Sequence, residues 1–280
     1  MITILRGIAE LRDWRKALPH DVSVGLVPTM GALHAGHISL VDLSRGRCDV
    51  TIASIFVNPL QFGPNEDLAK YPRPLDDDLA LLESAGCDAV FLPSVEDLYP
   101  AGASTYVVEE SVSLPLCGAF RPGHFRGVAT IVLKLFNLVQ PTRGFFGQKD
   151  AQQCAVIERM VRDLNVPVEV VRGAIIRETD GLAMSSRNVY LSPEERRLAP
   201  LIRQSILAAS NAYAAGERDA ARLTEIGRLL LERKPAFSVQ YWDVRDPDSL
   251  EALSLIGDKG ALIAVAAYLG KTRLIDNQLL

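Results

Sequence analysis

The alternation of strand-like and helical segments over residues 1–175 is the feature that most constrains the fold. The strand-like segments are apolar along almost their whole length, which is typical of parallel strands covered by helices on both faces. The pattern therefore predicts an α/β domain with a Rossmann-like, doubly wound parallel sheet, which binds ligands at the carboxyl ends of its strands. The expected strands are 22–27, 50–57, 88–92, 144–147 and 168–171, and the expected helices are 36–47, 75–85, 125–139 and 150–165.

Residues 176–280 predict a smaller α+β C-terminal domain, because two amphipathic helices are followed by several strands. The first expected helix has a clear start, with Ser192 as its N-cap and Pro193 in its first turn. The boundary between the two domains is expected near 174–177. The expected helices are 193–216 and 219–234, and the expected strands are 237–244, 261–268 and 272–276.

Residues 22–41 form a run of 20 residues without Asp, Glu, Lys or Arg. A run of about this length could cross a bilayer, but this one contains glycines, a proline and two histidines, which a spanning helix rarely combines. The sequence therefore predicts no membrane span. It also begins without a basic region followed by an apolar stretch, so we expect no signal peptide and a cytoplasmic protein.

Net charge and cysteine spacing argue against further classes of protein and of site. The formal net charge of −4 argues against nucleic acid as the main partner, because neutralising phosphates needs a basic surface. No two of the four cysteines are closer than 30 residues, which excludes Cys-x-x-Cys metal and redox motifs. We expect the thiols to stay reduced, and Cys154 to be buried and inert.

The segment 28–37 follows an expected strand and opens an expected helix. Its glycines allow a ligand to approach the backbone, and the first turn of the helix offers N–H groups to an anion. His34 and His37 share one side of that turn. The segment therefore predicts phosphate contacts, the alternative being a capped helix with two satisfied histidines. Zinc is not expected, because no third ligand is visible nearby.

The segment 57–62 ends the second expected strand and supplies Asn58 and Gln61. Gln61 suits a hydroxyl or carboxylate of a small substrate, although Asn-Pro is also ordinary turn chemistry. Further along, Asp77 and Asp78 offer oxygen ligands to a magnesium ion. The alternative for these two acids is a solvated helix start, where the helix dipole favours negative charge.

Two later segments also combine donors and positive charge. In 147–153, Lys149 offers a point charge for phosphate, and Gln153 could reach a substrate; the alternative is a surface pair of Lys149 with Asp150. In 180–188, hydroxyls precede Arg187, whose guanidinium can hold a phosphate in bidentate fashion. A polar linker between domains is the alternative for that segment. Residues 121–127 add further cationic donors before an apolar helix.

Taken together, these motifs resemble the pantothenate synthetase (pantoate–β-alanine ligase) family over essentially the whole chain. The first and last also look like the HIGH and KMSKS signatures of the wider nucleotidylyltransferase and class I synthetase superfamily. The small departures, such as Leu60 where the family often has Thr or Met, put no role in doubt. The hallmarks appear as PTMGALHAGH at 28–37, VNPLQF at 57–62, RPGHFRGV at 121–128, FGQKDAQQ at 146–153 and DGLAMSSRN at 180–188.

The resemblance implies a cytoplasmic ligase of pantothenate biosynthesis, acting as a homodimer with ATP as substrate and Mg²⁺. Pantoate attacks the α-phosphate of ATP to give pantoyl adenylate, and the amine of β-alanine then displaces AMP. It implies a domain of 1–175 that binds ATP and pantoate, and a lid of 176–280 whose closure would exclude water from the adenylate. The partners are then small molecules, with no nucleic acid and no membrane.

The resemblance also assigns residues. It implies catalytic roles for His34, His37, Lys149 and Arg187, with His37 as the proton donor. It assigns pantoate binding to Gln61 and Gln153, and β-alanine binding to Gln61. Asp77 and Asp78 remain the candidates for magnesium. The implied ATP contacts are Met30, Gly31, Ala32, Leu33, His34, Ala35, Gly36, His37, Gly147, Gln148, Lys149, Asp150, Ile176, Met184, Ser185, Ser186 and Arg187.

Other functions stay open on the sequence. A plain nucleotidylyltransferase would retain the adenylyl group in its product instead of releasing AMP. A nucleotide-sensing module would bind ATP without forming AMP. A class I tRNA synthetase is disfavoured, because the C-terminal region is short and the chain is acidic.

Overall fold

The computed structural model describes residues 2–64, 66 and 68–280, which divide into two compact units. The first contains the chain up to Glu110 together with Arg121–Gly147 and Gln153–Ala174. The second contains Ser111–Phe120, Gln148–Gln152 and Ile175–Leu280. The segments Ser111–Phe120 and Gln148–Gln152 of the second unit fall within the predicted first domain, 1–175.

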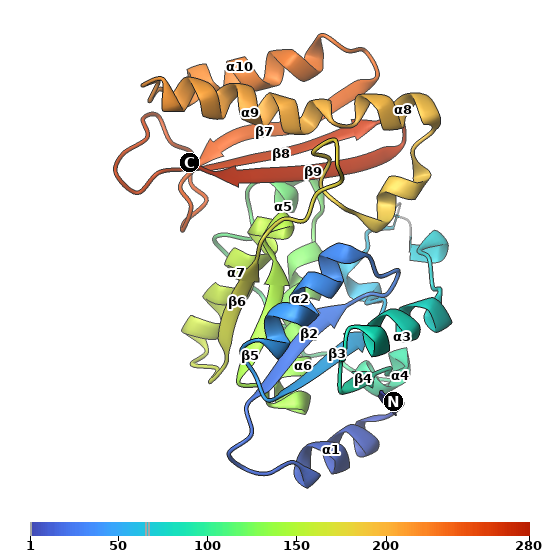
Figure 1. Cartoon of the computed structure of the whole chain (residues 1–280). Coiled ribbons are helices and arrows are strands. Elements are labelled where there is room, and N and C mark those ends of the chain that lie inside the picture. The colour runs from blue at the N-terminus through green and yellow to red at the C-terminus, as the bar shows by residue number, and fades with distance from the viewer. Residues whose placement is uncertain (1, 65, 67) are drawn as a thin grey trace. The chain divides into compact units, whose positions relative to one another are not determined.

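The first unit is built on a parallel sheet in the strand order β1-β4-β3-β2-β5-β6. This order confirms the predicted doubly wound sheet, because the chain runs outward from β2 in both directions (Figure 1). Only β1 lies outside the predicted set, since it is too short to give a periodic signal. The strands are β1 (Thr3–Leu5), β2 (Val24–Thr29), β3 (Val50–Ile55), β4 (Ala89–Phe91), β5 (Arg143–Gly147) and β6 (Glu169–Gly173).

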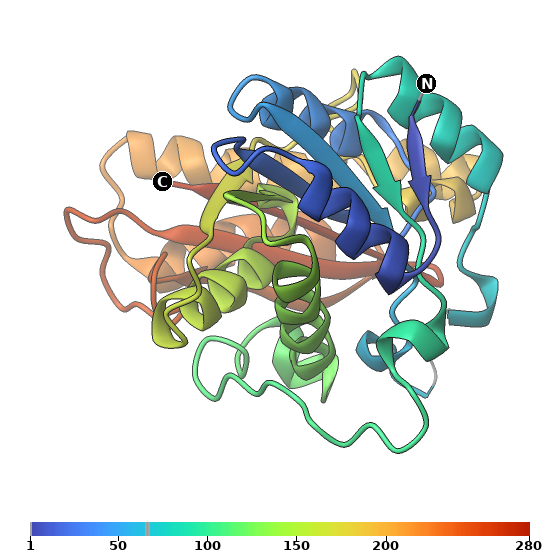
Figure 2. The same ribbon diagram turned by 90° about the horizontal axis from the view of Figure 1, so that it is seen from below.

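Helices cover both faces of this sheet, as Figure 2 shows, with α2 and α3 on one face and α1 and α6 on the other. The α2/α3 face packs buried side chains of Leu40, Val41 and Leu82 against Val27 and Ala53 of the sheet. The helices of the unit are α1 (Ile8–Ala17), α2 (Ala35–Arg45), α3 (Leu75–Ser84), α4 (Val95–Leu98), α6 (His124–Val139) and α7 (Ala151–Asp163, from its third residue), with the short 3₁₀ helices η1 (Pro59–Gln61) and η2 (Leu68–Lys70).

The second unit is an antiparallel sheet in the order β7-β8-β9, packed against helices. Trp242 is fully buried at its centre and donates from Nε1 to Ser205 Oγ at 2.9 Å. Gly227 makes room for the indole, because a Cβ there would lie 2.0 Å from the ring. The elements are α5 (Cys117–Phe120), η3 (Gln148–Asp150), η4 (Ser186–Tyr190), α8 (Pro193–Leu198), α9 (Leu201–Ala214), α10 (Ala220–Glu232), β7 (Phe237–Arg245), β8 (Leu262–Leu269) and β9 (Thr272–Leu279).

The predicted single helix 193–216 is in fact two helices, α8 and α9. Pro200 stands between them, and it has no N–H to continue the hydrogen bonds of α8. The start of α8 is as predicted, with Ser192 Oγ accepting from the Glu195 N–H.

No helix within 2–64, 66 and 68–280 is both long and apolar enough to cross a membrane. The charge-free run 22–41 lies instead in β2, the turn after it and the first half of α2.

Candidate active site

The turn after β2 is held by a buried carboxylate. Gly31 and Ala32 have φ angles of 81° and 51°, so the chain turns sharply through the left-handed region. Asp78, in the first turn of α3 and 1% exposed, accepts from the Ala32 N–H at 2.9 Å and the Leu33 N–H at 2.7 Å. These charge-assisted bonds fix the turn that leads into His34.

This geometry does not suit Asp77 and Asp78 as a magnesium pair. Both oxygens of Asp78 already accept N–H groups, whereas Asp77 is exposed on the surface of α3. Across the described part of the chain, no group of three or more His, Cys, Asp or Glu side chains could hold a metal ion. Asp78 is therefore a residue that shapes the loop.

Asp78 should give the stability of the protein a pH dependence. Burial raises the pKa of this carboxyl, so the folded chain binds the proton more tightly than the unfolded chain does. The free energy of unfolding then falls as pH rises from the ordinary aspartate value, about 4, through the raised folded value. Asp78→Asn removes this contribution. Urea unfolding across pH 4–8 measures it, with exposed Asp76→Asn as the control; parallel profiles for wild type and Asp78→Asn would contradict it.

The two histidines cap the helix that they begin. His34 is the N-cap of α2, and its Nδ1 accepts from the Gly36 N–H at 3.1 Å. The Nδ1 of His37 accepts from the His34 N–H at 3.3 Å, and the two rings lie 4.2 Å apart between centroids. Because each Nδ1 acts as an acceptor, the neutral rings carry their protons on Nε2. The capping alternative is thus real, and in this tautomer the ring N–H of each imidazole is at Nε2.

Gln61 lies in a polar network at the end of β3. It is 9% exposed, its Oε1 accepts from Asn58 Nδ2 at 3.2 Å, and its Nε2 lies 2.7 Å from Met30 Sδ. Asn58 Nδ2 also donates to Gly127 O at 3.1 Å, and Asn58 Oδ1 accepts from the Tyr99 hydroxyl at 2.8 Å. The structure thus brings together two predicted site residues, Met30 and Gln61.

Residues of the 121–128 motif hold the main chain of Gln61. Arg121 donates to Gln61 O at 3.2 Å and pairs through its guanidinium with Glu66, while His124 Nδ1 lies 2.8 Å from the same carbonyl. Sequence reasoning found these cations but not their task. They act on the backbone of a predicted substrate residue from about 60 positions away.

Gly127 lets α6 approach η1 closely. A Cβ at this position would lie 2.4 Å from Leu60 O and 2.7 Å from the Gln61 N atom. We expect Gly127→Ala to lower the free energy of unfolding by about 1–3 kcal/mol, as overpacking does. Gly46→Ala is the control, since a Cβ there meets atoms only at 3.5 Å or more. Chemical denaturation of both variants measures this, and equal free energies of unfolding would contradict it.

Two adjacent glutamines in the segment 147–153 have different surroundings. Gln152 is 7% exposed and has a structural task, because its amide bonds the Cys117 N–H at 2.9 Å and the Val112 and Pro115 carbonyls at 2.9 and 2.6 Å. Gln153, the predicted substrate residue, is half-buried on α7. Lys149 Nζ lies 3.6 Å from the Asp150 carboxylate, so the predicted surface pair exists, and the Lys149 side chain is 21% exposed.

The segment 176–188 is an ordered hairpin of the second unit. The Met184 N–H donates to Ile176 O at 2.9 Å, and Arg177 pairs with Ala183 as an antiparallel bridge. Ser185 caps η4 by accepting from the Arg187 N–H at 3.3 Å. Arg196 pairs with Asp180 at 2.6 Å and holds the pKa of that carboxyl below its ordinary value.

A family model described as pantoate-beta-alanine ligase matches residues 3–279. The chain belongs to the pantoate–β-alanine ligase family. Among curated relatives, the pantothenate synthetase of Herpetosiphon aurantiacus is 56% identical over 273 residues, covering 98% of this chain and 99% of the relative. That of Chloroflexus aurantiacus (strain ATCC 29366) is 54% identical over 277 residues, covering 99% and 98%.

Solved structures of the pantoate–β-alanine ligase family have the same fold. The pantothenate synthetase of Thermus thermophilus superposes with a TM-score of 0.94 at 48% identity, with 99% of each chain covered. The pantoate–β-alanine ligase of Francisella tularensis, solved with beta-gamma ATP and β-alanine, gives a TM-score of 0.81 at 33% identity, covering 100% of this chain and 98% of that one.

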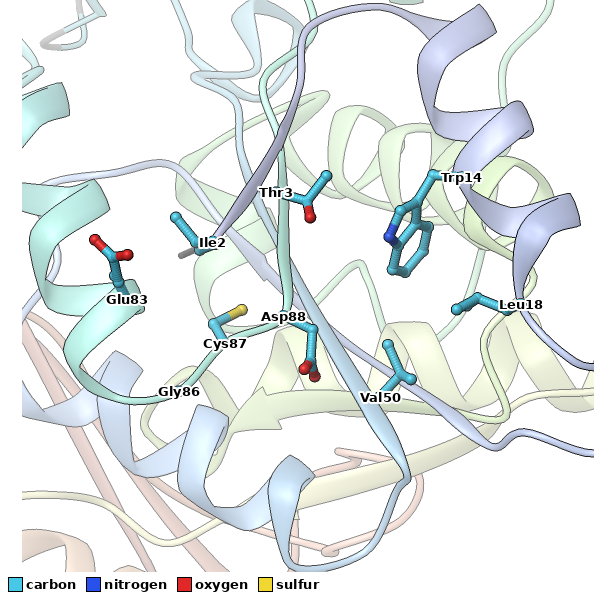
Figure 3. Close-up of a pocket in the computed structure, with 9 residues that line it drawn as sticks. All are labelled: Ile2, Thr3, Trp14, Leu18, Val50, Glu83, Gly86, Cys87 and Asp88. Carbon is cyan, nitrogen blue, oxygen red and sulfur yellow. The ribbon is translucent and has the colours of Figure 1, made fainter.

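One cavity of about 460 Å³ lies away from the motifs that mark this family. Figure 3 shows residues of its lining, among them Trp14 of α1, Val50 at the start of β3, and Cys87 and Asp88 just before β4. These positions are at the amino ends of the strands, whereas the motif loops follow the carboxyl ends of β2, β3 and β5. Ligands of open α/β sheets bind at the carboxyl ends, so this cavity is not the candidate site.

Proposed function

We propose that this chain joins pantoate to β-alanine in an ATP-dependent, AMP-forming reaction that yields pantothenate. The observation that carries the proposal is the match of the family model to residues 3–279, together with near-complete mutual coverage of the named relatives. The Francisella neighbour, which was solved with beta-gamma ATP and β-alanine, supports two of the substrates.

The reaction proceeds in two displacements. A carboxylate oxygen of pantoate attacks the α-phosphorus of ATP, and the bond to the β-phosphate oxygen breaks to release pyrophosphate. The amine of β-alanine then attacks the acyl carbon of pantoyl adenylate, AMP leaves, and the amine loses a proton. Neither step needs a covalent bond to the protein, so the protein's task is to align the reactants and stabilise charge.

Several motif segments are proposed to bind ATP. The residues Met30–His37 and Gly147 would contact the nucleotide, with Nε2–H groups of His34 and His37 donating to phosphate oxygens. The segments Gln148–Asp150 and Met184–Arg187 and the backbone of Ile176 are proposed as further ATP contacts. Lys149 and Arg187 would then stabilise the negative charge that develops on the departing pyrophosphate.

Pantoate is proposed to bind Gln61 and Gln153, and β-alanine to bind Gln61. The support for Gln61 is its burial beside Met30, with its main chain held by Arg121 and its side chain by Asn58. An amide with both a donor and an acceptor can bond the hydroxyls and carboxylate of pantoate. The geometry of Gln153 adds only that its half-buried side chain lies on α7.

Three further proposals rest on the family. Mg²⁺ is expected to reach the site with the phosphates of ATP, which commonly supply its ligands, since Asp77 and Asp78 do not fit it. The protein is proposed to be cytoplasmic. It is also proposed to be a homodimer, and light scattering can test this oligomeric state. The division into an ATP- and pantoate-binding domain of 1–175 and a lid of 176–280 is proposed as well.

An assay for AMP that omits each substrate in turn tests the function. AMP should form only when ATP, pantoate and β-alanine are all present, and positional isotope exchange in labelled ATP should require pantoate but not β-alanine. Exchange that needs β-alanine would reject the adenylate scheme. Retention of the adenylyl group in the product would favour a plain nucleotidylyltransferase, and ATP binding without AMP would favour a sensor.

A further inference from the structure

Strand β9 carries two adjacent polar residues that are almost completely buried. Asp276 is 3% exposed and Asn277 is 4% exposed. Neighbouring side chains of a strand point to opposite sides, so these two reach different parts of the second unit. Burying polar groups is costly unless they are hydrogen-bonded, and their partners therefore indicate what they are for.

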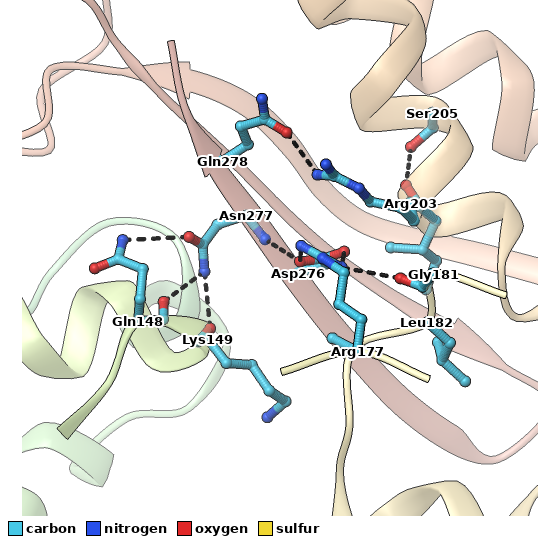
Figure 4. Close-up of polar contacts among 12 residues, drawn as sticks. Gln148, Lys149, Arg177, Gly181, Leu182, Arg203, Ser205, Asp276, Asn277 and Gln278 are labelled. Atoms are coloured by element: carbon cyan, nitrogen blue, oxygen red, sulfur yellow. Dashed lines mark hydrogen bonds and ion pairs between the residues drawn. The ribbon is translucent and has the colours of Figure 1, made fainter. Parts of the chain in front are cut away.

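Asn277 binds the main chain of the turn that carries Lys149. Its Nδ2 donates to Gln148 O at 2.8 Å and to Lys149 O at 2.9 Å, and its Oδ1 accepts from Gln148 Nε2 at 3.3 Å. Figure 4 shows the amide of Asn277 facing this turn, with the Lys149 side chain extending away from it. Three hydrogen bonds thus hold η3 against β9, and none of them involves the Lys149 ammonium.

Asp276 binds the hairpin that leads to Arg187. Its two oxygens accept from the Arg177 guanidinium at 2.7 and 2.9 Å, and the same guanidinium donates to Gly181 O at 3.0 Å. The Asp276 carboxylate also accepts the N–H of Asn277 at 2.8 Å. The bidentate pair fixes the orientation of the hairpin as well as its distance from β9.

We propose that Asp276 and Asn277 are positioning residues that set Lys149 and Arg187 at a fixed spacing for the phosphates of ATP. This inference rests on the proposed function, because it concerns the same ATP site. One strand holds both cation-bearing segments, although the segments are far apart in the chain. Catalysis of phosphoryl and adenylyl transfer depends mainly on alignment, and a displacement of 1 Å can slow it by about 100-fold.

The first test is Asn277→Ala, with the two half-reactions measured separately. The rate of adenylate formation from ATP and pantoate, measured by rapid quench, should fall by about 10- to 100-fold. Attack of β-alanine on preformed enzyme-bound adenylate should change far less, since pyrophosphate has already left. The ratio of the two rates is the readout, because a partly unfolded sample lowers both rates equally. An unchanged ratio would overturn the proposal for Asn277.

A double-mutant cycle separates positioning from general support of the fold. If Asn277 acts through Lys149, then Asn277→Ala should add little further loss of adenylate formation in a Lys149→Ala background. Additive losses would show that Asn277 acts by another route and would overturn the proposal. Gln278→Ala is the matched control on β9, because its Oε1 bonds Arg203 and neither ATP-binding segment; it should keep the wild-type ratio.

The corresponding pair for Asp276 is Asp276→Asn and Asp276→Ala. Asparagine keeps an acceptor for Arg177 and should retain more of the adenylate-forming rate than alanine, while Arg187→Ala should mask the effect of either. Equal ratios for both variants and wild type would overturn the role of Asp276. Failure of the proposed function would appear differently, as absence of AMP formation by the wild-type protein itself.

Discussion

Alanine in place of Lys149 is expected to lower the rate of AMP formation by about 100- to 1,000-fold, as loss of a group that stabilises developing charge typically does. The fold should survive the change. Lys149 Nζ pairs with Asp150 at 3.6 Å, and the side chain of that acid is 45% exposed. A pair so open to water contributes about 0–1 kcal/mol to stability.

Two further variants make the Lys149 result specific. Lys149→Met keeps the length of the apolar stem and should lose as much activity as Lys149→Ala, because the charge is what acts. Lys16→Ala removes an exposed lysine that pairs with Asp13 at 4.0 Å, and it should leave turnover unchanged. Steady-state rates and thermal unfolding measure both properties. Near-wild-type turnover of Lys149→Met would refute the assignment of phosphate binding to this charge.

For His37 we expect the two amide replacements to behave differently. In His37→Asn, Oδ1 can accept the His34 N–H as Nδ1 does at 3.3 Å, but no donor remains at the Nε2 position. AMP formation should fall by about 100-fold or more, with the helix still capped. In His37→Gln, the amide N–H₂ reaches the Nε2 position and should restore part of the rate.

The order of the two His37 variants is the informative result. If His37→Asn turned over faster than His37→Gln, the cap would matter more than the Nε2–H donor, and the phosphate assignment would be wrong. Circular dichroism of both variants controls for loss of α2. A pH profile that stays the same in shape for His37→Gln would show that hydrogen bonding, and not proton transfer, is what the imidazole supplies.

Most of the sheet could be predicted because its strands are apolar on both faces. Segments such as Val50–Ile55 and Ala89–Phe91 carry that signal in a few consecutive residues. The helix α1 was missed because Leu11 is its one buried residue among many charged ones. The break at Pro200 is not apparent from the apolar periodicity, which continues across it, although a proline is itself a signal that ends a helix.

Local chemistry in the sequence provides candidate site residues, but it could not predict the residues that hold them in place. The bond from Asp78 to the Leu33 N–H joins residues 45 positions apart, and that from Asn277 to Lys149 spans 128. A sequence pattern shows that an acid stands at a helix start, and the dipole explains it adequately. Only the packing of α3 beside the turn after β2 reveals which N–H groups donate hydrogen bonds to that acid.

The chain has two tryptophans, and each unit contains one of them. Trp242 is sealed in the core of the second unit, whereas Trp14 is half-buried beside the cavity of the first. Their indoles should therefore emit at different wavelengths and respond to different parts of the protein. Trp14→Phe leaves a fluorophore that reports the second unit alone, and Trp242→Phe does the same for the first. Intrinsic fluorescence can thus show whether the two units unfold together or one before the other.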